Sequence, residues 1–163
     1  MNLLKTRRET LLAPLQAVTG IIERHHTLPI LSNVLLSRAD SHIDFVATDI
    51  EIEITASMAV EEPGEVKKIT VGARKLFDIL RALPEGADVT LALQDKRLQV
   101  KSGKSRFNLQ TLSAEDFPRL VVAESTGTCF SIPQKLLKSL LGLVQYAMAQ
   151  QDIRYYLNGL LMV

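Results

Sequence analysis

The sequence predicts an α+β protein built from repeated modules, each made of a strand, a helix and three further strands. Three segments of the chain align with one another without gaps: residues 4–18, 69–83 and 130–144. Their starts lie 65 and 61 residues apart, a spacing that indicates an internal architectural repeat. Strand-like runs separated by turn residues follow the first two segments. These observations predict two whole modules and the beginning of a third.

Each aligned segment has apolar residues at the spacing of an amphipathic helix. The apolar stripes are Leu11, Leu15, Val18 and Ile22 in the first segment, Ala73, Leu76, Phe77, Leu80 and Leu83 in the second, and Leu136, Leu137, Leu140, Leu141 and Val144 in the third. A short strand-like run precedes the second and third helices. We expect Ser131 to cap the third helix, with Pro133 in its first turn, and Pro14 to bend the first helix.

The strand-like runs after the first helix are NVLLSRA, HIDFVATD and EIEITASMAV, and those after the second are DVTLALQ, RLQVKSG and RFNLQTL. The alternation in EIEITASMAV is typical of a half-exposed antiparallel strand. The third helix is followed by GLLMV, an apolar strand that would leave an open hydrophobic edge. We therefore expect residues 1–124 to form a first domain of two modules. Residues 125–163 are expected to be the truncated start of a second domain in a longer protein.

The composition argues against several classes of protein. The 163-residue chain is 47% hydrophobic, which suits a globular protein, and its net charge of +1 argues against a strongly basic nucleic-acid binder. No apolar run is long enough to span a membrane, and the first residues lack the pattern of a signal peptide. A single cysteine, Cys129, excludes an internal disulfide framework. We therefore expect a protein of the reducing cytoplasm.

No group of residues in the sequence is arranged like a catalytic or metal-binding motif. A glycine-rich phosphate loop, GxSxG and HExxH are all missing from it. Asp49 and Glu51 lie two residues apart in a strand-like run, so both side chains would point to the same face. A catalytic carboxylate pair is possible there, but an exposed polar strand face is commoner. His25 and His26 are adjacent, so their side chains point apart and do not form a pair of metal ligands. We expect no catalytic residue, no metal and no cofactor, and keep a small α+β enzyme using these residues as an alternative.

Basic side chains gather on the helix faces that lie opposite the apolar stripes. Arg74, Asp78 and Arg81 share the polar face of the second helix, and Arg7 and Arg8 begin the first. On any single helix such a face is most often simply solvated. Repetition on successive modules favours a shared, mildly positive surface, which suits contact with a phosphate backbone without reading of sequence.

The polar stretch AQQDIRYYLNG places Tyr155 and Tyr156 beside Arg154. Aromatic rings next to an arginine suit stacking and hydrogen bonding with nucleic-acid strands. The alternative is a strand in which one tyrosine ring points inward and the other points outward.

Five stretches of the chain carry a family resemblance: TLPILSNVLL, TDIEIEI, ARKLFDILRALPEGA, KSGKSRFNLQTLSAEDFPRL and YAMAQQDIRYYLNGLL. In this order and spacing they resemble the bacterial sliding clamps, the β subunits of replicative DNA polymerase III, from residue 4 to residue 163. The resemblance implies the DNA clamp fold, with antiparallel sheets outside and helices lining one face. It also implies a longer subunit of three domains, two copies of which close head to tail into a ring around DNA.

The resemblance further implies three functional surfaces. The implied DNA contacts are Arg24, His25, Arg74, Arg81, Gln151, Tyr155 and Tyr156, with His25 in the place of a family arginine. One wall of a pocket for partner peptides is implied at Arg154, Tyr156 and Leu157. The implied dimer interface comprises Lys75, Arg97, Lys104, Arg106, Phe107 and Leu109. Its basic residues discourage self-pairing of a sheet edge, and Phe107 and Leu109 would supply an apolar anchor.

By this resemblance the protein is expected to be a processivity factor, the non-catalytic subunit of a DNA-directed DNA polymerase holoenzyme. Its expected partners are double-stranded and primed DNA, a second copy of itself, the polymerase III core, the clamp loader and other proteins with clamp-binding motifs. No membrane partner is expected. The alternative is a peptide-binding interaction scaffold that does not encircle DNA.

Overall fold

The computed structural model describes residues 2–22, 28–60, 66–120 and 130–163. The chain divides into two compact units, Met1–Val121 and Val122–Val163. The first unit contains β1 (Asn2–Arg7), α1 (Arg8–Thr19), the short 3-10 helix η1 (Pro29–Ser32), β2 (Asn33–Arg38), β3 (His42–Thr48), β4 (Glu53–Ala59), β5 (Lys67–Gly72), α2 (Ala73–Ala82), β6 (Asp88–Gln94), β7 (Arg97–Ser102) and β8 (Ser105–Leu112). This order confirms two successive β-α-β-β-β modules, and β1 provides the first module with an opening strand as well.

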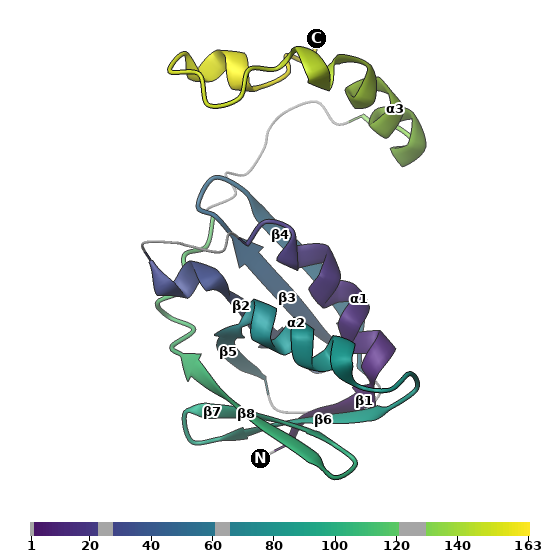
Figure 1. The fold of residues 1–163 in the computed structure, drawn as a ribbon, viewed down its shortest axis with the longest axis vertical. Coiled ribbons are helices and arrows are strands. Elements are labelled where there is room, and N and C mark those ends of the chain that lie inside the picture. Colours follow the sequence, from purple (N-terminus) through teal and green to yellow (C-terminus); the bar gives the residue numbers. More distant parts are fainter. Residues whose placement is uncertain (1, 23–27, 61–65, 121–129) are drawn as a thin grey trace. The chain divides into compact units, whose positions relative to one another are not determined.

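The strands of the first unit form one curled antiparallel sheet in the order β1-β6-β7-β8-β5-β2-β3-β4 (Figure 1). The opening strand of each module pairs with a strand of the other module: β1 of the first module pairs with β6, and β5 of the second module pairs with β2. Strand β5 also pairs with β8 of its own module. The modules are therefore interleaved through β1 and β5, and neither can complete its part of the sheet alone.

The sheet has two halves, β1-β6-β7-β8 and β5-β2-β3-β4, which meet at a short junction between β8 and β5. The paired residues there are Thr70 with Leu112 and Val71 with Thr111. The buried hydroxyl of Thr70 donates to the Leu112 carbonyl at 2.9 Å and accepts from the Asn33 amide at 3.2 Å. These side-chain bonds strengthen a junction that has few main-chain pairs. The pairing with β5 is confined to the end of β8. Residues 105–110 therefore pair with β7 on one side, and no described strand pairs with them on the other.

Helices α1 and α2 lie side by side over one face of the sheet (Figure 1). Leu11, Leu15 and Val18 of α1 are fully buried. Leu76 and Leu80 of α2 are at most 1% exposed. The predicted apolar stripes of the first two helices are thus confirmed, except that Phe77 is only partly buried. Helix α1 continues through Pro14. The helical layer on one face and the antiparallel sheet behind it confirm the predicted fold class.

Arg8, at the start of α1, contacts the last turn of α2. Its Nε donates to the Leu80 carbonyl at 2.7 Å, and its Nη2 donates to the Arg81 carbonyl at 3.2 Å. Carbonyls in the last turn of a helix have no partner within the helix, so this side chain caps α2. Arg8 was expected to belong to an exposed basic face, and the structure gives it this structural contact instead.

A segment after β8 packs on the outer face of the sheet, opposite the helices. Phe117 is 4% exposed and packs with Leu35 of β2 and Val46 of β3 in a small second core. The guanidinium of Arg119 then forms a two-pronged bond with the Glu53 carboxylate, both N–O distances being 2.9 Å. These contacts hold the end of the first unit against its own sheet.

The interpretation of Asp49 and Glu51 as neighbours on one face of a strand is wrong. Both residues lie in the turn between β3 and β4, where the Asp49 carboxylate accepts the N–H groups of Glu51 and Ile52 at 3.0 and 2.8 Å. A short side chain such as aspartate stabilises turns in this way. The Asp49 carboxylate therefore holds the turn rather than forming a pair with Glu51.

The second unit contains α3 (Gln134–Val144) and two 3-10 helices, η2 (Gln145–Ala147) and η3 (Tyr155–Asn158). The apolar residues of α3 are not buried. Pro133 occupies the N-cap position without a side-chain cap, so the prediction that Ser131 caps this helix is wrong. The expected strand at GLLMV is also wrong, because residues 159–163 have no regular structure. No helix among the described residues is long and apolar enough to cross a membrane.

Candidate nucleic-acid interface

The polar face of α2 borders a surface hollow between the two helices of the first unit. With Leu76 and Leu80 turned into the core, the helical period leaves Arg74, Asp78 and Arg81 exposed. The residues that line the hollow are Gln16, Thr19, Gly20, Arg74, Phe77, Asp78 and Arg81. Two of the residues predicted to contact DNA, Arg74 and Arg81, are therefore brought to one place, and α1 contributes polar groups that the sequence did not single out.

The two arginines of this hollow are held differently. Arg74 Nη2 donates to the Ile22 carbonyl at 2.8 Å, which directs this guanidinium toward the end of α1. Arg81 lies in the last turn of α2, where a positive charge interacts favourably with the helix dipole. Arg24, His25 and His26, which were predicted to contribute next to these helices, lie outside the described residues, as does Cys129.

In the second unit, Tyr155 is 83% exposed and Tyr156 is 68% exposed. Their rings meet edge to face, with centroids 5.9 Å apart and planes at 77°. Both residues belong to η3, so the alternative of a strand with one ring inward and one outward is wrong. Gln151, just before them, is exposed and has a positive φ of 59°, which belongs to the left-handed region.

The loop that carries these tyrosines is held by Asp152. Its carboxylate accepts two bonds from the Arg154 guanidinium, both at 3.0 Å, and the Arg154 N–H at 2.8 Å. The Asn158 amide closes the loop by bonding to the backbone of Asp152 in both directions. The Arg154 side chain holds the pKa of Asp152 below its usual range, and Asp152 in turn raises the pKa of Arg154. Leu157, the remaining residue predicted for the peptide pocket, is 37% exposed.

The hairpin of β7 and β8 carries most of the predicted dimer interface. Gly103, with φ of +54°, turns the chain at its tip, where a side chain would be strained. Arg97, Lys104 and Arg106 are exposed along the hairpin. Phe107 is 36% exposed, whereas Leu109 is 8% exposed and belongs to the main core, so Phe107 is the accessible apolar residue of the two.

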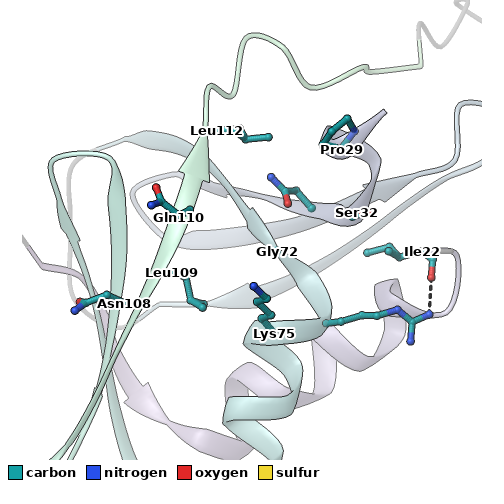
Figure 2. Close-up of a pocket in the computed structure, with 11 residues that line it drawn as sticks. Ile22, Pro29, Ser32, Gly72, Lys75, Asn108, Leu109, Gln110 and Leu112 are labelled. Carbon is teal, nitrogen blue, oxygen red and sulfur yellow. Dashed lines mark hydrogen bonds between the residues drawn. The ribbon is translucent and has the colours of Figure 1, made fainter. Parts of the chain in front are cut away.

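A second hollow, of about 470 Å³, lies beside the edge of β8. Figure 2 shows Lys75 of α2 and Leu109 of β8 at this hollow, together with Asn108, Gln110 and Leu112. Ile22, Pro29, Ser32, Asn33, Gly72 and Arg74 complete its lining. The contributions of η1 and β2 were not predicted, because these elements lie far from β8 in the chain and no local pattern links them to it.

The described residues give little support to a catalytic centre. On the outer sheet face, Asp44 accepts a bond from the Ser57 hydroxyl at 2.6 Å and lies 3.6 Å from His42 Nε2. The carboxylate thus stands between the hydroxyl and the imidazole, and His42 is not placed to take a proton from Ser57. Among the described residues there is also no cluster of three or more His, Cys, Asp or Glu side chains that could hold a metal ion.

Comparisons of sequence and of structure with known proteins all match the same protein family. Residues 1–121 match the family model described as DNA polymerase III beta subunit, N-terminal domain. The chain is 46% identical over 156 residues to a beta sliding clamp of Pseudomonas putida and 49% identical over 154 residues to that of Escherichia coli K12. These alignments cover 96% and 94% of the chain, and 42% of each relative. The crystal structure of the DNA polymerase III subunit beta from Pseudomonas aeruginosa superposes with a TM-score of 0.90 at 46% identity, covering 98% of this chain and 43% of that one.

Proposed function

This chain belongs to the DNA polymerase III beta subunit family, and we propose that it forms part of a sliding clamp that encircles duplex DNA. The observation that carries the proposal is the joint exposure of Arg74 and Arg81 at the hollow between α1 and α2. The chain spans about 42% of the length of its relatives, so the ring requires regions beyond those described. Residues 1–124 would be the first domain of the subunit, and residues 125–163 the start of the central one.

The proposed clamp performs no bond-making chemistry. A closed ring turns weak, salt-sensitive contacts into retention by topology, because DNA cannot leave a ring sideways. Sliding then requires contacts that are numerous, weak and independent of sequence, which arginine and polar side chains provide to phosphates. A polymerase tethered to the ring finds its primer end again at a high effective concentration. The protein would therefore act as a processivity factor.

The tyrosine loop would add DNA contacts from the second unit. Gln151, Tyr155 and Tyr156 expose a polar group and two rings from a loop held by Asp152. Aromatic faces stack on bases of any sequence, which suits a primed or partly single-stranded junction. Arg154, Tyr156 and Leu157 would also form one wall of the pocket for peptides of the polymerase III core, the clamp loader and other clamp-binding proteins.

The edge of β8 would join this subunit to a second copy, head to tail. The ladder bond from Thr111 N to Lys96 O at 3.1 Å sets the alternation along β7 and β8. By that alternation the N–H and C=O groups of Arg106 and Asn108 face away from β7, toward the open edge. A partner strand with acidic side chains would pair there, near Lys75, Arg97, Lys104 and Arg106, and Phe107 would pack against it. We place the assembled clamp in the cytoplasm.

The experiment that tests the clamp uses the full-length protein, loaded by an active clamp loader onto nicked circular DNA. Retention is measured before and after the circle is cut once. Loss that follows linearisation supports a ring that slides off ends. Equal retention on circular and linear DNA contradicts topological binding, and failure to bind either favours a peptide-binding scaffold.

A further inference from the structure

An acidic side chain interrupts the arginine face of α2. Asp78 lies four residues after Arg74 and three before Arg81, so all three project from neighbouring turns on one side of the helix. All three line the hollow between α1 and α2. Any phosphate that approaches these two arginines therefore also approaches a carboxylate.

Among the described residues, no ion pair or side-chain hydrogen bond gives Asp78 a structural role. Asp78 is exposed. Arg74, the cation one turn away, is instead bonded to the Ile22 carbonyl. The positive charge of Arg74 therefore remains available to a phosphate and is not neutralised by Asp78.

The position of Asp78 is also unfavourable for the helix itself. Aspartate is among the weaker helix formers in a helix interior. Asp78 lies in the interior of α2 (Ala73–Ala82), outside the first turn, where the helix dipole would favour a negative charge. A residue that breaks a local rule without a structural gain is expected at functional surfaces.

We propose that Asp78 weakens the contact between α2 and DNA, so that the clamp holds phosphates loosely enough to slide. This inference rests on the proposed function of the α2 face as a DNA contact. The carboxylate repels the phosphates that Arg74 and Arg81 attract, which lowers the affinity of each local contact. A lower local affinity means a lower barrier between one phosphate register and the next, while the ring itself prevents dissociation.

The test compares the full-length protein with its Asp78→Asn variant, which removes the charge and nearly preserves the shape. Equilibrium binding to a short linear duplex is measured over a series of salt concentrations. We expect the variant to bind about two- to fivefold more tightly at low salt. The plot of log affinity against log salt concentration is expected to be steeper by up to about 0.9. Diffusion along DNA, followed on single molecules of loaded clamp, is expected to slow.

Two control variants show whether the charge at this position is responsible for the change in binding. Asp88→Asn makes the same charge change at an exposed position on β6 and is expected to leave binding unchanged. Asp78→Glu keeps the charge and is expected to behave like the unmodified protein. Tighter binding by Asp78→Glu as well would indicate an effect of helix stability and would overturn the inference.

Arg74→Gln distinguishes failure of the inference from failure of the proposed function. If Arg74→Gln weakens binding but Asp78→Asn leaves affinity, salt dependence and diffusion unchanged, the α2 face contacts DNA and Asp78 does not tune it. If neither substitution changes binding, the α2 face is not a DNA contact, and the assignment on which the inference rests is overturned with it.

Discussion

The side chain of Arg8 joins the first residue of α1 to the Leu80 carbonyl in the last turn of α2, with an Nε–O distance of 2.7 Å. The two residues are separated by 72 positions in the chain. The contact ties the beginning of one helix to the end of the other, so the helices run in opposite directions along the sheet. The hollow that exposes Arg74, Asp78 and Arg81 lies between these two helices.

Replacing Arg8 with methionine is expected to destabilise the first unit. Methionine keeps an unbranched apolar stem but removes the bonds to the Leu80 and Arg81 carbonyls. Because hydrogen bonds to charged donors are stronger than neutral ones, the free energy of unfolding is expected to fall by about 1.5–3 kcal/mol. Urea denaturation measures this change. Arg7→Met, at an exposed neighbouring position, serves as the control, and an equal loss in both variants would contradict the capping role.

Glu9 is expected to make stability depend on pH in the acidic range. The Gly86 N–H above all, followed by the Glu9 N–H and the Arg8 side chain, holds the pKa of Glu9 below its ordinary value of 4.5. A lowered pKa in the folded state means that the stabilisation is present above the unfolded pKa. It is lost as the pH falls through the lower, folded pKa.

The measurement compares the unmodified protein with Glu9→Gln by urea denaturation between about pH 7 and about pH 3. The unmodified protein is expected to be the more stable at neutral pH, and the difference is expected to shrink in acid. Glu51→Gln, at an exposed turn residue, is the control. A difference for Glu9→Gln that stays constant across this range would show that its charge is not responsible.

Phe117→Ala is expected to loosen the end of the first unit. The ring packs on the outer face of the sheet between Leu35 and Val46, and the alanine leaves a cavity there. The expected loss of stability is about 3 kcal/mol, at the lower end for buried phenylalanine because the cluster is small. Ile52→Ala, at a residue 55% exposed, is expected to cost far less. Faster hydrogen exchange at Leu35 and Val46 in the Phe117 variant would localise the effect, and unchanged stability would contradict it.

Asn108→Pro is expected to weaken the proposed dimer while sparing the fold. The N–H of Asn108 faces the open edge of β8, so proline removes a donor to the partner strand without removing a bond to β7. Loss of a pairing bond in a buried interface is expected to weaken the dimer of the full-length protein by about 10- to 100-fold. Analytical ultracentrifugation measures the dissociation constant.

Asn108→Ala is the matched control for this experiment, because it keeps the main-chain N–H and removes only the side chain. Its dimer is expected to remain close to that of the unmodified protein. If proline and alanine weaken the dimer equally, or if neither does, main-chain pairing at this edge is not what holds the subunits together.

Local patterns predicted much of the fold of the first unit. The helical stripes around Leu11 and Leu76 were correctly predicted to be buried, because burial of one helix face follows from spacing along the chain itself. The exposure of Arg74 and Arg81 follows from the same period. The pattern failed at Asp49, where alternation suggested a strand but a side-chain bond to the Ile52 N–H makes a turn. It failed again at residues 159–163, where apolar character did not produce a strand.

The repeated modules could be predicted from the chain alone, because the aligned segments recur along it. The buried helix faces and the exposed arginines of α2 could also be predicted, because each depends on residues within a few turns of one another. Three other features are visible only in the folded chain: the modules interleave through β1 and β5, β8 has an open edge beside Lys75, and Arg8 caps α2 instead of facing solvent. These features depend on contacts between residues tens of positions apart. Neither periodicity nor charge spacing encodes which strand or carbonyl will be the partner.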